Sequence, residues 1–205
     1  MRLLWMVITV AGICWAGETT ANGNLRKDES AERKAQVLEK KIAGEGSKTP
    51  SAAAKIRKVE VQAVDPTGKG ALDNAITCLS RTIYWEARGD GAAGMEAIAN
   101  VVMNRLGHEG FPDSVCKVVK EGARQGMCQF SWWCRWRSAE AKDAASYTLA
   151  KEISRRALNR QLPDRTAGAL YFHQSNVTPA WSKKYRQTAK IGKLLFYKPR
   201  GATAR

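Results

Sequence analysis

The stretch LDNAITCLSRTIYWEARGDGAAGMEAIANVVMNRL, residues 72–106, decides the fold of this chain. Apolar residues recur three or four positions apart on both sides of the break Gly89-Asp90-Gly91. This spacing predicts one helix over 72–88 and a second over 94–106, because a glycine-rich break ends a helix. The apolar positions are Leu72, Ile76, Leu79 and Ile83 in the first helix and Met95, Ile98, Ala99, Val102 and Leu106 in the second.

The rest of this region predicts two more helices and a little sheet. Pro112 stands near the start of a short helix over 112–120, and a longer helix is expected over 139–158. Residues 169–173 and 193–198 are typical of short strands, which we expect to form an antiparallel pair. The predicted fold class is α+β and mostly α, in one domain over 71–200.

The N-terminus has the layout of an export signal. Met1-Arg2 gives a positive start, an apolar run follows over 3–16, and the chain turns polar from Glu18. This order is typical of a secretory signal peptide over residues 1–21, cleaved after Ala16 or Ala21. The alternative is a short signal anchor that stays attached, although the run is short for a membrane span. We therefore expect an exported protein, located in the periplasm, the cell wall or outside the cell.

Residues 22–70 have the composition of a linker. They are rich in Lys, Glu, Ala, Gly and Ser and nearly free of aromatic residues. A helix over 30–42 is expected, with Ala31, Ala35, Leu38 and Ile42 at helical spacing, but the stripe is thin for a core. We expect this segment to be a charged, flexible linker.

Charge narrows the choice of partner. The 205 residues hold 34 Lys+Arg against 19 Asp+Glu, a net charge of +15, and residues 71–205 carry +11 of it. So basic a chain points to nucleic acid, an anionic membrane or an anionic polymer outside the cell. No apolar run approaches the ~18 to 20 residues of a membrane span, which argues against a multi-span membrane protein. Export favours an anionic polymer of the cell envelope over nucleic acid.

The cysteines support export as well. Of five cysteines, four lie beyond the expected signal, namely Cys78, Cys116, Cys128 and Cys134. An even number in an exported chain predicts two disulfides, with three possible pairings, and a bridge between the last two cysteines would pin the segment QFSWW. Zinc fits poorly, because no CxxC is present and the chain has only two histidines. We expect no metal and no cofactor.

Glu86 is a candidate catalytic residue. On a helical projection it falls in the apolar sector of the first helix, three residues after Ile83. Burial of a carboxylate raises its pKa, so that it can hold a proton near neutral pH and donate it to a glycosidic oxygen. The alternative is a structural ion pair with Arg88 or Arg105.

The sequence motifs around Glu86 resemble those of a known family. The sequence is similar to the cell wall hydrolase family typified by the spore-cortex-lytic enzyme SleB, over nearly all of residues 72–198 and in collinear order. The matching pieces are Glu86-Ala87-Arg88-Gly89-Asp90, Gly94, Asn104-Arg105, FPDSVCKVV (111–119), CQFSWWC (128–134), GALYFH (168–173), Pro179-Ala180-Trp181 and IGKLLFYK (191–198). The resemblance implies a lysozyme-like α+β fold, cleavage of peptidoglycan glycan strands, and Glu86 as the catalytic glutamate.

Related enzymes are often lytic transglycosylases, which need one carboxyl group and release a 1,6-anhydro end. Alternatives stay open at this point: a muramidase with Asp90, Asp113 or Asp164 as a second carboxylate, an amidase, a non-enzymatic basic binding module, or an inactive scaffold. Leu194 stands where the family usually has a histidine in the last strand.

The other candidate residues fall into two groups. We expect Gln129, Ser131, Trp132 and Tyr171 to bind substrate, because polar groups beside aromatic rings suit sugars. We expect a supporting set behind the catalytic glutamate, namely Arg88, Asp90, Asn104 and Arg105. Trp133, Trp136 and Trp181 are as well explained as core or surface filler, and His173 as structural. The expected partners are peptidoglycan strands and anionic envelope polymers, bound by a monomer.

Overall fold

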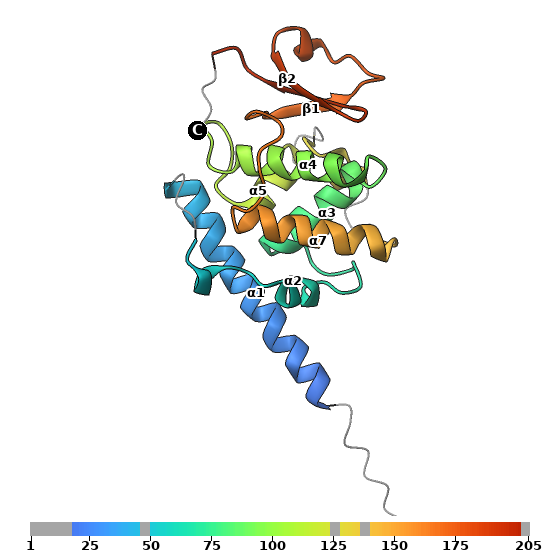
Figure 1. Ribbon diagram of the computed structural model, residues 1–205. Helices are drawn as coiled ribbons and strands as arrows, with labels where there is room; N and C mark the ends of the chain where they lie inside the picture. The colour runs from blue at the N-terminus through green and yellow to red at the C-terminus, as the bar shows by residue number, and fades with distance from the viewer. Residues whose placement is uncertain (1–17, 46–49, 124–127, 136–139, 202–205) are drawn as a thin grey trace, which may run out of the picture.

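The computed structural model describes residues 18–45, 50–123, 128–135 and 140–201, and it places a helical body against a small sheet (Figure 1). The sheet lies at one end, α4 and α5 lie next to it, α3 and α7 form the middle, and α1 and α2 cover the far side. The elements in chain order are α1 (Glu18–Glu45), η1 (Ala52–Ala54), α2 (Lys58–Ala63), α3 (Ala75–Ala87), α4 (Gly91–Arg105), α5 (Val115–Lys120), α6 (Ser131–Arg135), α7 (Ala144–Leu158), β1 (Tyr171–Gln174), η3 (Ala180–Lys183), β2 (Arg186–Ile191) and β3 (Leu194–Lys198).

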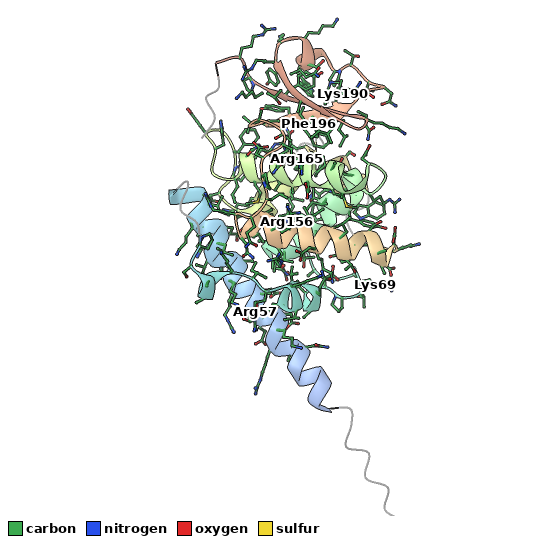
Figure 2. The ribbon with its side chains drawn as sticks, viewed as in Figure 1. Arg57, Lys69, Arg156, Arg165, Lys190 and Phe196 are labelled. Carbon is green, nitrogen blue, oxygen red and sulfur yellow. A yellow bond between two sulfur atoms is a disulfide. The ribbon has the colours of Figure 1, made fainter. Side chains whose placement is uncertain are left out.

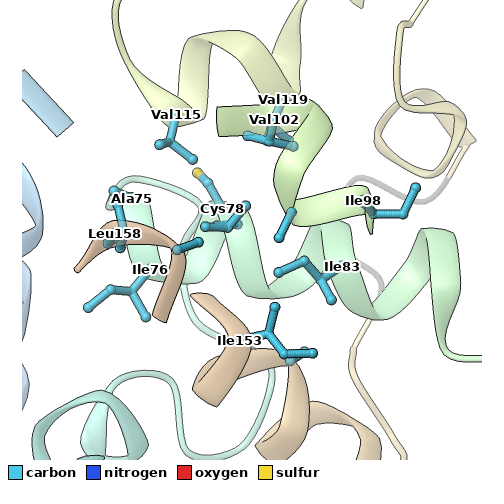
Figure 3. Close-up of a cluster of buried hydrophobic side chains, with 14 of the residues drawn as sticks. Ala75, Ile76, Cys78, Ile83, Ile98, Val102, Val115, Val119, Ile153 and Leu158 are labelled. Atoms are coloured by element: carbon cyan, nitrogen blue, oxygen red, sulfur yellow. The ribbon is translucent and has the colours of Figure 1, made fainter. Parts of the chain in front are cut away.

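Helix α3 is the centre of the core. The Asn74 side chain caps its start by accepting a hydrogen bond from the Thr77 N–H at 2.8 Å. Almost every residue of α3 is buried, because α4, α5 and α7 pack around it. Figure 3 shows apolar side chains of these four helices meeting at one place. Those labelled are Ala75, Ile76, Cys78 and Ile83 from α3, Ile98 and Val102 from α4, Val115 and Val119 from α5, and Ile153 and Leu158 from α7.

The four helices predicted over 71–200 are present as α3, α4, α5 and α7, with ends that differ by a few residues. The α+β, mostly helical class is therefore confirmed. The short helices α2 and α6 were not predicted, because α2 lies in the segment that was expected to be a linker and the five residues of α6 carry too little periodicity.

The sheet has three antiparallel strands in the order β1-β3-β2. The two predicted strands do pair, with Phe172 opposite Phe196. Strand β2 was not expected, because its sequence RQTAKI lies at an edge, stays mostly accessible to solvent, and so lacks an apolar signal. It still joins the sheet through its backbone, with a register shift between Gln187 and Ala189.

The prediction of a flexible linker over 22–70 is wrong for the parts of that segment that the structure describes. The predicted stripe of α1 does form, and Ala31, Ala35, Leu38 and Ile42 are all buried in the main core. The stripe is thin, yet it suffices because α2, α3 and α7 already supply the opposing surface. The folded body therefore includes α1 and α2 as well as residues 71–200.

A second contact fixes the segment after α1. The Ile56 backbone N–H donates to Asn159 Oδ1 at 2.9 Å, and Asn159 Nδ2 donates back to the Ile56 carbonyl at 2.8 Å. Such a reciprocal pair over 103 residues of sequence cannot be read from local pattern. The expected signal over 1–21 lies outside the described residues except for its last four, and it stays a prediction. Among the described helices, none combines the length and the apolar character needed to cross a membrane.

The four predicted cysteines form two disulfides. Cys78 bonds to Cys116 and joins α3 to α5, while Cys128 bonds to Cys134 and closes the segment that leads into α6. The structure thus selects one of the three pairings that the sequence left open.

Basic side chains are distributed along the whole body. Figure 2 labels Arg57 and Lys69 near α2, Arg156 and Arg165 in the helical middle, and Lys190 in the sheet. Two of these arginines are paired, since Arg156 and Arg165 contact the Glu96 carboxylate at 2.6 and 3.0 Å. The positive charge therefore does not belong to one tail or one element.

Candidate active site

Glu86 lies in the last turn of α3 and is partly buried. Burial raises the pKa of its carboxyl from 4.5 to about 7, against the opposing effects of the Trp132 and Ser131 backbone N–H groups and of the Arg105 charge. Its Oε1 atom is buried and has no hydrogen-bond partner within the described parts of the chain. The predicted direction of the pKa is confirmed, and Glu86 can hold a proton close to neutral pH.

The two N–H groups come from the start of α6, which the Cys128–Cys134 disulfide ties back on itself. Phe130 and Trp132 anchor this segment, with exposed fractions of 0% and 1%. The disulfide thus closes the segment on itself, and packing holds it against α3. Sequence reasoning expected polar side chains here to bind substrate and missed that the backbone amides face Glu86.

The expected role of Trp132 as a sugar-binding ring does not fit its position. Its side chain is buried in the core and packs against Trp133, with ring centroids 6.0 Å apart. A ring without an exposed face cannot stack on a sugar. By contrast, Gln129 and Ser131 are exposed, and Tyr171 is partly exposed.

Arg88 and Asp90, the expected supporting residues near the break between α3 and α4, do not contact each other through an ion pair. Arg88 is exposed, donates from Nη1 to Tyr84 Oη at 2.9 Å, and lies over the Trp85 ring at 4.7 Å. Asp90 stands at the N-cap position of α4 without a side-chain capping bond. A Cβ on Gly94 would lie 2.5 Å from the Asp90 Cβ, so only glycine permits this close turn. Among the described residues, neither Arg88 nor Asp90 forms an ion pair with Glu86 or with each other.

Asn104 connects the end of α4 to the segment that enters β1. Its Nδ2 donates to the Ala169 carbonyl at 3.1 Å and reaches Thr166 Oγ1 and Asp164 Oδ2 at 3.3 Å. The Asp164 carboxylate also accepts from the Thr166 hydroxyl at 2.6 Å and from the Gly168 N–H at 2.7 Å. This carboxylate is thus occupied in shaping its own loop.

Arg105 is the most deeply buried charge of the site, with an exposed fraction of 2%. Its Nε donates to the Leu170 carbonyl at 2.7 Å, and its guanidinium lies 5.1 to 5.5 Å from the ring centroids of Phe111, Phe130 and Tyr171. Burial lowers its pKa to about 10, which the nearby Glu121, Tyr171 and Glu86 partly offset. The sequence did not point to Glu121, whose own pKa is raised by burial.

A pocket of about 370 Å³ lies next to Arg105, between the α6 segment and the sheet. Its lining residues are Arg105, Cys128, Gln129, Tyr171, Phe172, His173, Pro179, Trp181 and Tyr185. The structure thus brings together two of the expected substrate-binding residues, Gln129 and Tyr171. Sequence reasoning missed Tyr185, and it treated Trp181 as filler, because their convergence depends on how the 174–186 connection folds back.

The remaining residues that the sequence singled out, in the sheet and among the acids, contribute to packing or to surface ion pairs. Leu194 is fully buried in the core, opposite Gln174 on β1, so an apolar side chain suits this place. His173 Nε2 lies 3.1 Å from Tyr197 Oη, in a stacked pair of rings. Asp113 is exposed and pairs with Lys117 at 2.9 Å. The described residues contain no cluster of His, Cys, Asp or Glu that could hold a metal ion.

Comparison with known proteins identifies relatives of this chain. A family model described as Cell Wall Hydrolase matches residues 89–197, just after Glu86. The spore cortex-lytic enzyme of Halalkalibacterium halodurans is 32% identical over 131 residues, which is 62% of this chain and 36% of that protein. That of Bacillus subtilis is 31% identical over 147 residues, 70% of this chain and 43% of that protein. The chain thus spans less than half the length of these relatives.

Solved structures agree with these matches. The catalytic domain of the germination-specific lytic transglycosylase SleB from Bacillus anthracis superposes with a TM-score of 0.51 at 28% identity, covering 63% of this chain and 98% of that domain. The catalytic domain of the Bacillus cereus SleB protein gives 0.50 at 27% identity, covering 65% and 97%. The likeness therefore extends over a whole catalytic domain.

Proposed function

The chain belongs to the cell wall hydrolase family, and on that basis we propose that it is an exported enzyme that degrades peptidoglycan. The proposed reaction is cleavage of the bond between N-acetylmuramic acid and N-acetylglucosamine, by lytic transglycosylation. Glu86 is the proposed catalytic residue. The observation that carries the proposal is a partly buried carboxyl with a pKa of about 7, in a chain related to cell wall hydrolases.

The proposed steps need one carboxyl group. Protonated Glu86 donates its proton to the glycosidic oxygen, and the bond from that oxygen to C1 of N-acetylmuramic acid breaks. The C6 hydroxyl of the same sugar attacks C1, and the Glu86 carboxylate takes up the hydroxyl proton. The products are a free 4-hydroxyl on N-acetylglucosamine and a 1,6-anhydro end, and Glu86 is protonated again.

The positions of the other acids support a single-carboxylate reaction. Asp164 binds its own loop, Asp113 pairs with Lys117, and Asp90 lies at the start of α4 beside Gly94. Glu121 is the acid that favours the hydrolytic alternative, since it is partly buried and interacts with Arg105, as Glu86 does. A second carboxylate would activate a water and leave a reducing end.

Digestion of purified sacculi by the full chain tests the proposal. Mass spectrometry of the products distinguishes anhydro ends from reducing ends, because they differ by one water. We expect anhydro products, no detectable activity for Glu86→Gln, and normal activity for the control Glu109→Gln in an exposed loop. Full activity of Glu86→Gln would refute the role of Glu86, and reducing ends that vanish in Glu121→Gln would establish a two-carboxylate hydrolase.

Export and retention on the envelope are further parts of the proposal. The apolar run near the N-terminus supports export, and the net charge of +15 supports retention on an anionic polymer. Expression with the native N-terminus, followed by N-terminal sequencing of the exported protein, tests the leader. A full-length chain found only inside the cell would contradict it.

A further inference from the structure

The pocket beside Arg105 has one aromatic wall. The Tyr171 ring centroid lies 4.8 Å from that of Tyr185 and 5.7 Å from that of Trp181, and all three rings line the pocket. Gln129 adds an exposed amide at the edge. Aromatic walls of this kind pack against the apolar faces of sugar rings, while amides fix their hydroxyl groups.

Arg105 gives the pocket a buried positive charge whose hydrogen-bonding capacity is not used up. Only 2% of the residue is exposed, and its Nε is bonded to the Leu170 carbonyl at 2.7 Å. Its Nη1 is buried and has no hydrogen-bond partner in the part of the chain that the structure describes. A guanidinium offers five N–H donors in a planar fork, and leaving buried donors unmet is costly.

We propose that this pocket is a subsite for a carboxylate carried by the glycan, bound by the Arg105 guanidinium and flanked by the aromatic wall. The proposal rests on the proposed function and specifies its substrate. In peptidoglycan such a carboxylate comes from two sources: the lactyl group of an N-acetylmuramic acid that lacks its stem peptide, or the stem peptide itself. The guanidinium fork matches the planar carboxylate, and charge-assisted hydrogen bonds of this type are strong.

Two protein carboxyls compete for the same charge. Glu121 and Glu86 both interact with Arg105, and burial raises the pKa of each carboxyl while the Arg105 charge opposes that rise. If Glu121 alone satisfied Arg105, a ligand carboxylate would gain nothing from the pocket. A binding experiment can therefore separate the two cases.

The experiment is isothermal titration calorimetry on the full chain at pH 6, with N-acetylmuramic acid and its methyl ester as probes. The two probes differ at the lactyl group, which is an anionic carboxylate in the acid and a neutral group, larger by one methyl, in the ester. We expect the acid to bind about tenfold tighter than the ester. Arg105→Met should remove this ratio, and Arg105→Lys should reduce it at least about threefold, because an ammonium lacks the planar fork. The matched control Trp181→Ala should weaken both probes by similar factors and leave the ratio intact.

Muramyl dipeptide and its methyl ester distinguish the two sources. Discrimination between these two compounds would place a stem-peptide carboxylate in the pocket, and discrimination confined to the first pair would place the lactyl carboxylate there. Equal binding of acid and ester in both pairs would overturn the proposal. A ratio unchanged in Arg105→Lys would also overturn it, a result that stands even if Arg105→Met does not fold. Sacculus cleavage is scored separately, so an active enzyme with no acid preference would refute the subsite alone.

Discussion

Replacing Glu86 by glutamine should remove a loss of stability that the wild type undergoes as the pH rises through neutrality, and it should also remove activity. The folded-state pKa of Glu86 is about 7 against 4.5 for an ordinary glutamate, so between these values the folded state holds a proton that the unfolded state has lost. Raising the pH through this window therefore destabilises the wild type. Below about pH 4 both states are protonated, and the penalty is absent.

The size of the effect follows from the same two values. The difference between 4.5 and about 7 corresponds to about 3 kcal/mol of unfolding free energy, reached in full above about pH 8. Glutamine carries no charge at any pH and cannot lose this free energy. The stability of Glu86→Gln relative to wild type should therefore rise by about 3 kcal/mol between pH 4 and pH 8. Any fixed effect of the amide on contacts with Ser131 and Trp132 is the same at both ends and cancels.

Urea denaturation of both proteins at pH 4, 6 and 8 provides the measurement. Glu121 also titrates with a raised pKa, but it is present in both proteins and is removed by the subtraction. Activity on sacculi in parallel should fall in the wild type as the pH rises past 7, because the general acid is then deprotonated. A stability difference that stays constant from pH 4 to pH 8 would show that Glu86 is not desolvated as described.

Three further changes test the fold. Gly107→Ala should lower the free energy of unfolding by about 3 kcal/mol or more, because Gly107 has a φ of 67° and a Cβ there would lie 2.5 Å from a backbone oxygen of α1. Gly110→Ala should lower it by only about 1 kcal/mol, because Gly110 has a φ of 81° but open space around it. Thermal or urea unfolding measures both. Asp65→Asn should cost about 3 to 5 kcal/mol, since it breaks a buried ion pair at 3.3 Å, whereas Asp113→Asn at an exposed pair should cost less than about 1 kcal/mol; similar values would contradict the burial. Replacing Cys78 and Cys116 by serine should lower the free energy of unfolding by about 4 kcal/mol, because this disulfide closes a loop with a separation of 38 residues. Replacing Cys128 and Cys134 by serine should lower it by about 2 kcal/mol, because the separation is 6. The reverse order of the urea midpoints would contradict loop-closure entropy as the source of the stabilisation.

The N-terminal segment shows where composition misleads. Residues 22–70 have the composition of a linker, yet Leu38 and Ile56 are 1% exposed in the common core. A helix with a thin apolar stripe cannot build a core by itself, but it can complete one that other helices have begun. Local composition reports what a segment could bury by itself and says nothing about the surface that it meets.

The sequence by itself determined the positions of the main helices and the candidate catalytic residue, Glu86. The spacing around Ile83 and the break at Gly89 predicted α3 and α4, and the projection of that first helix placed Glu86 at the edge of the core with a raised pKa. These features could be predicted because they depend on residues close in sequence, where helix geometry relates side chains to one another.

Only the tertiary structure decided what surrounds that glutamate. It buried the Trp132 side chain in the core while the backbone N–H of Trp132 faces Glu86, and it paired Cys78 of α3 with Cys116 of α5. It also brought Arg105, at the end of α4, and Tyr185, just before β2, to one pocket. These relations join residues tens of positions apart, and they arise from the packing of whole elements, which local periodicity does not encode.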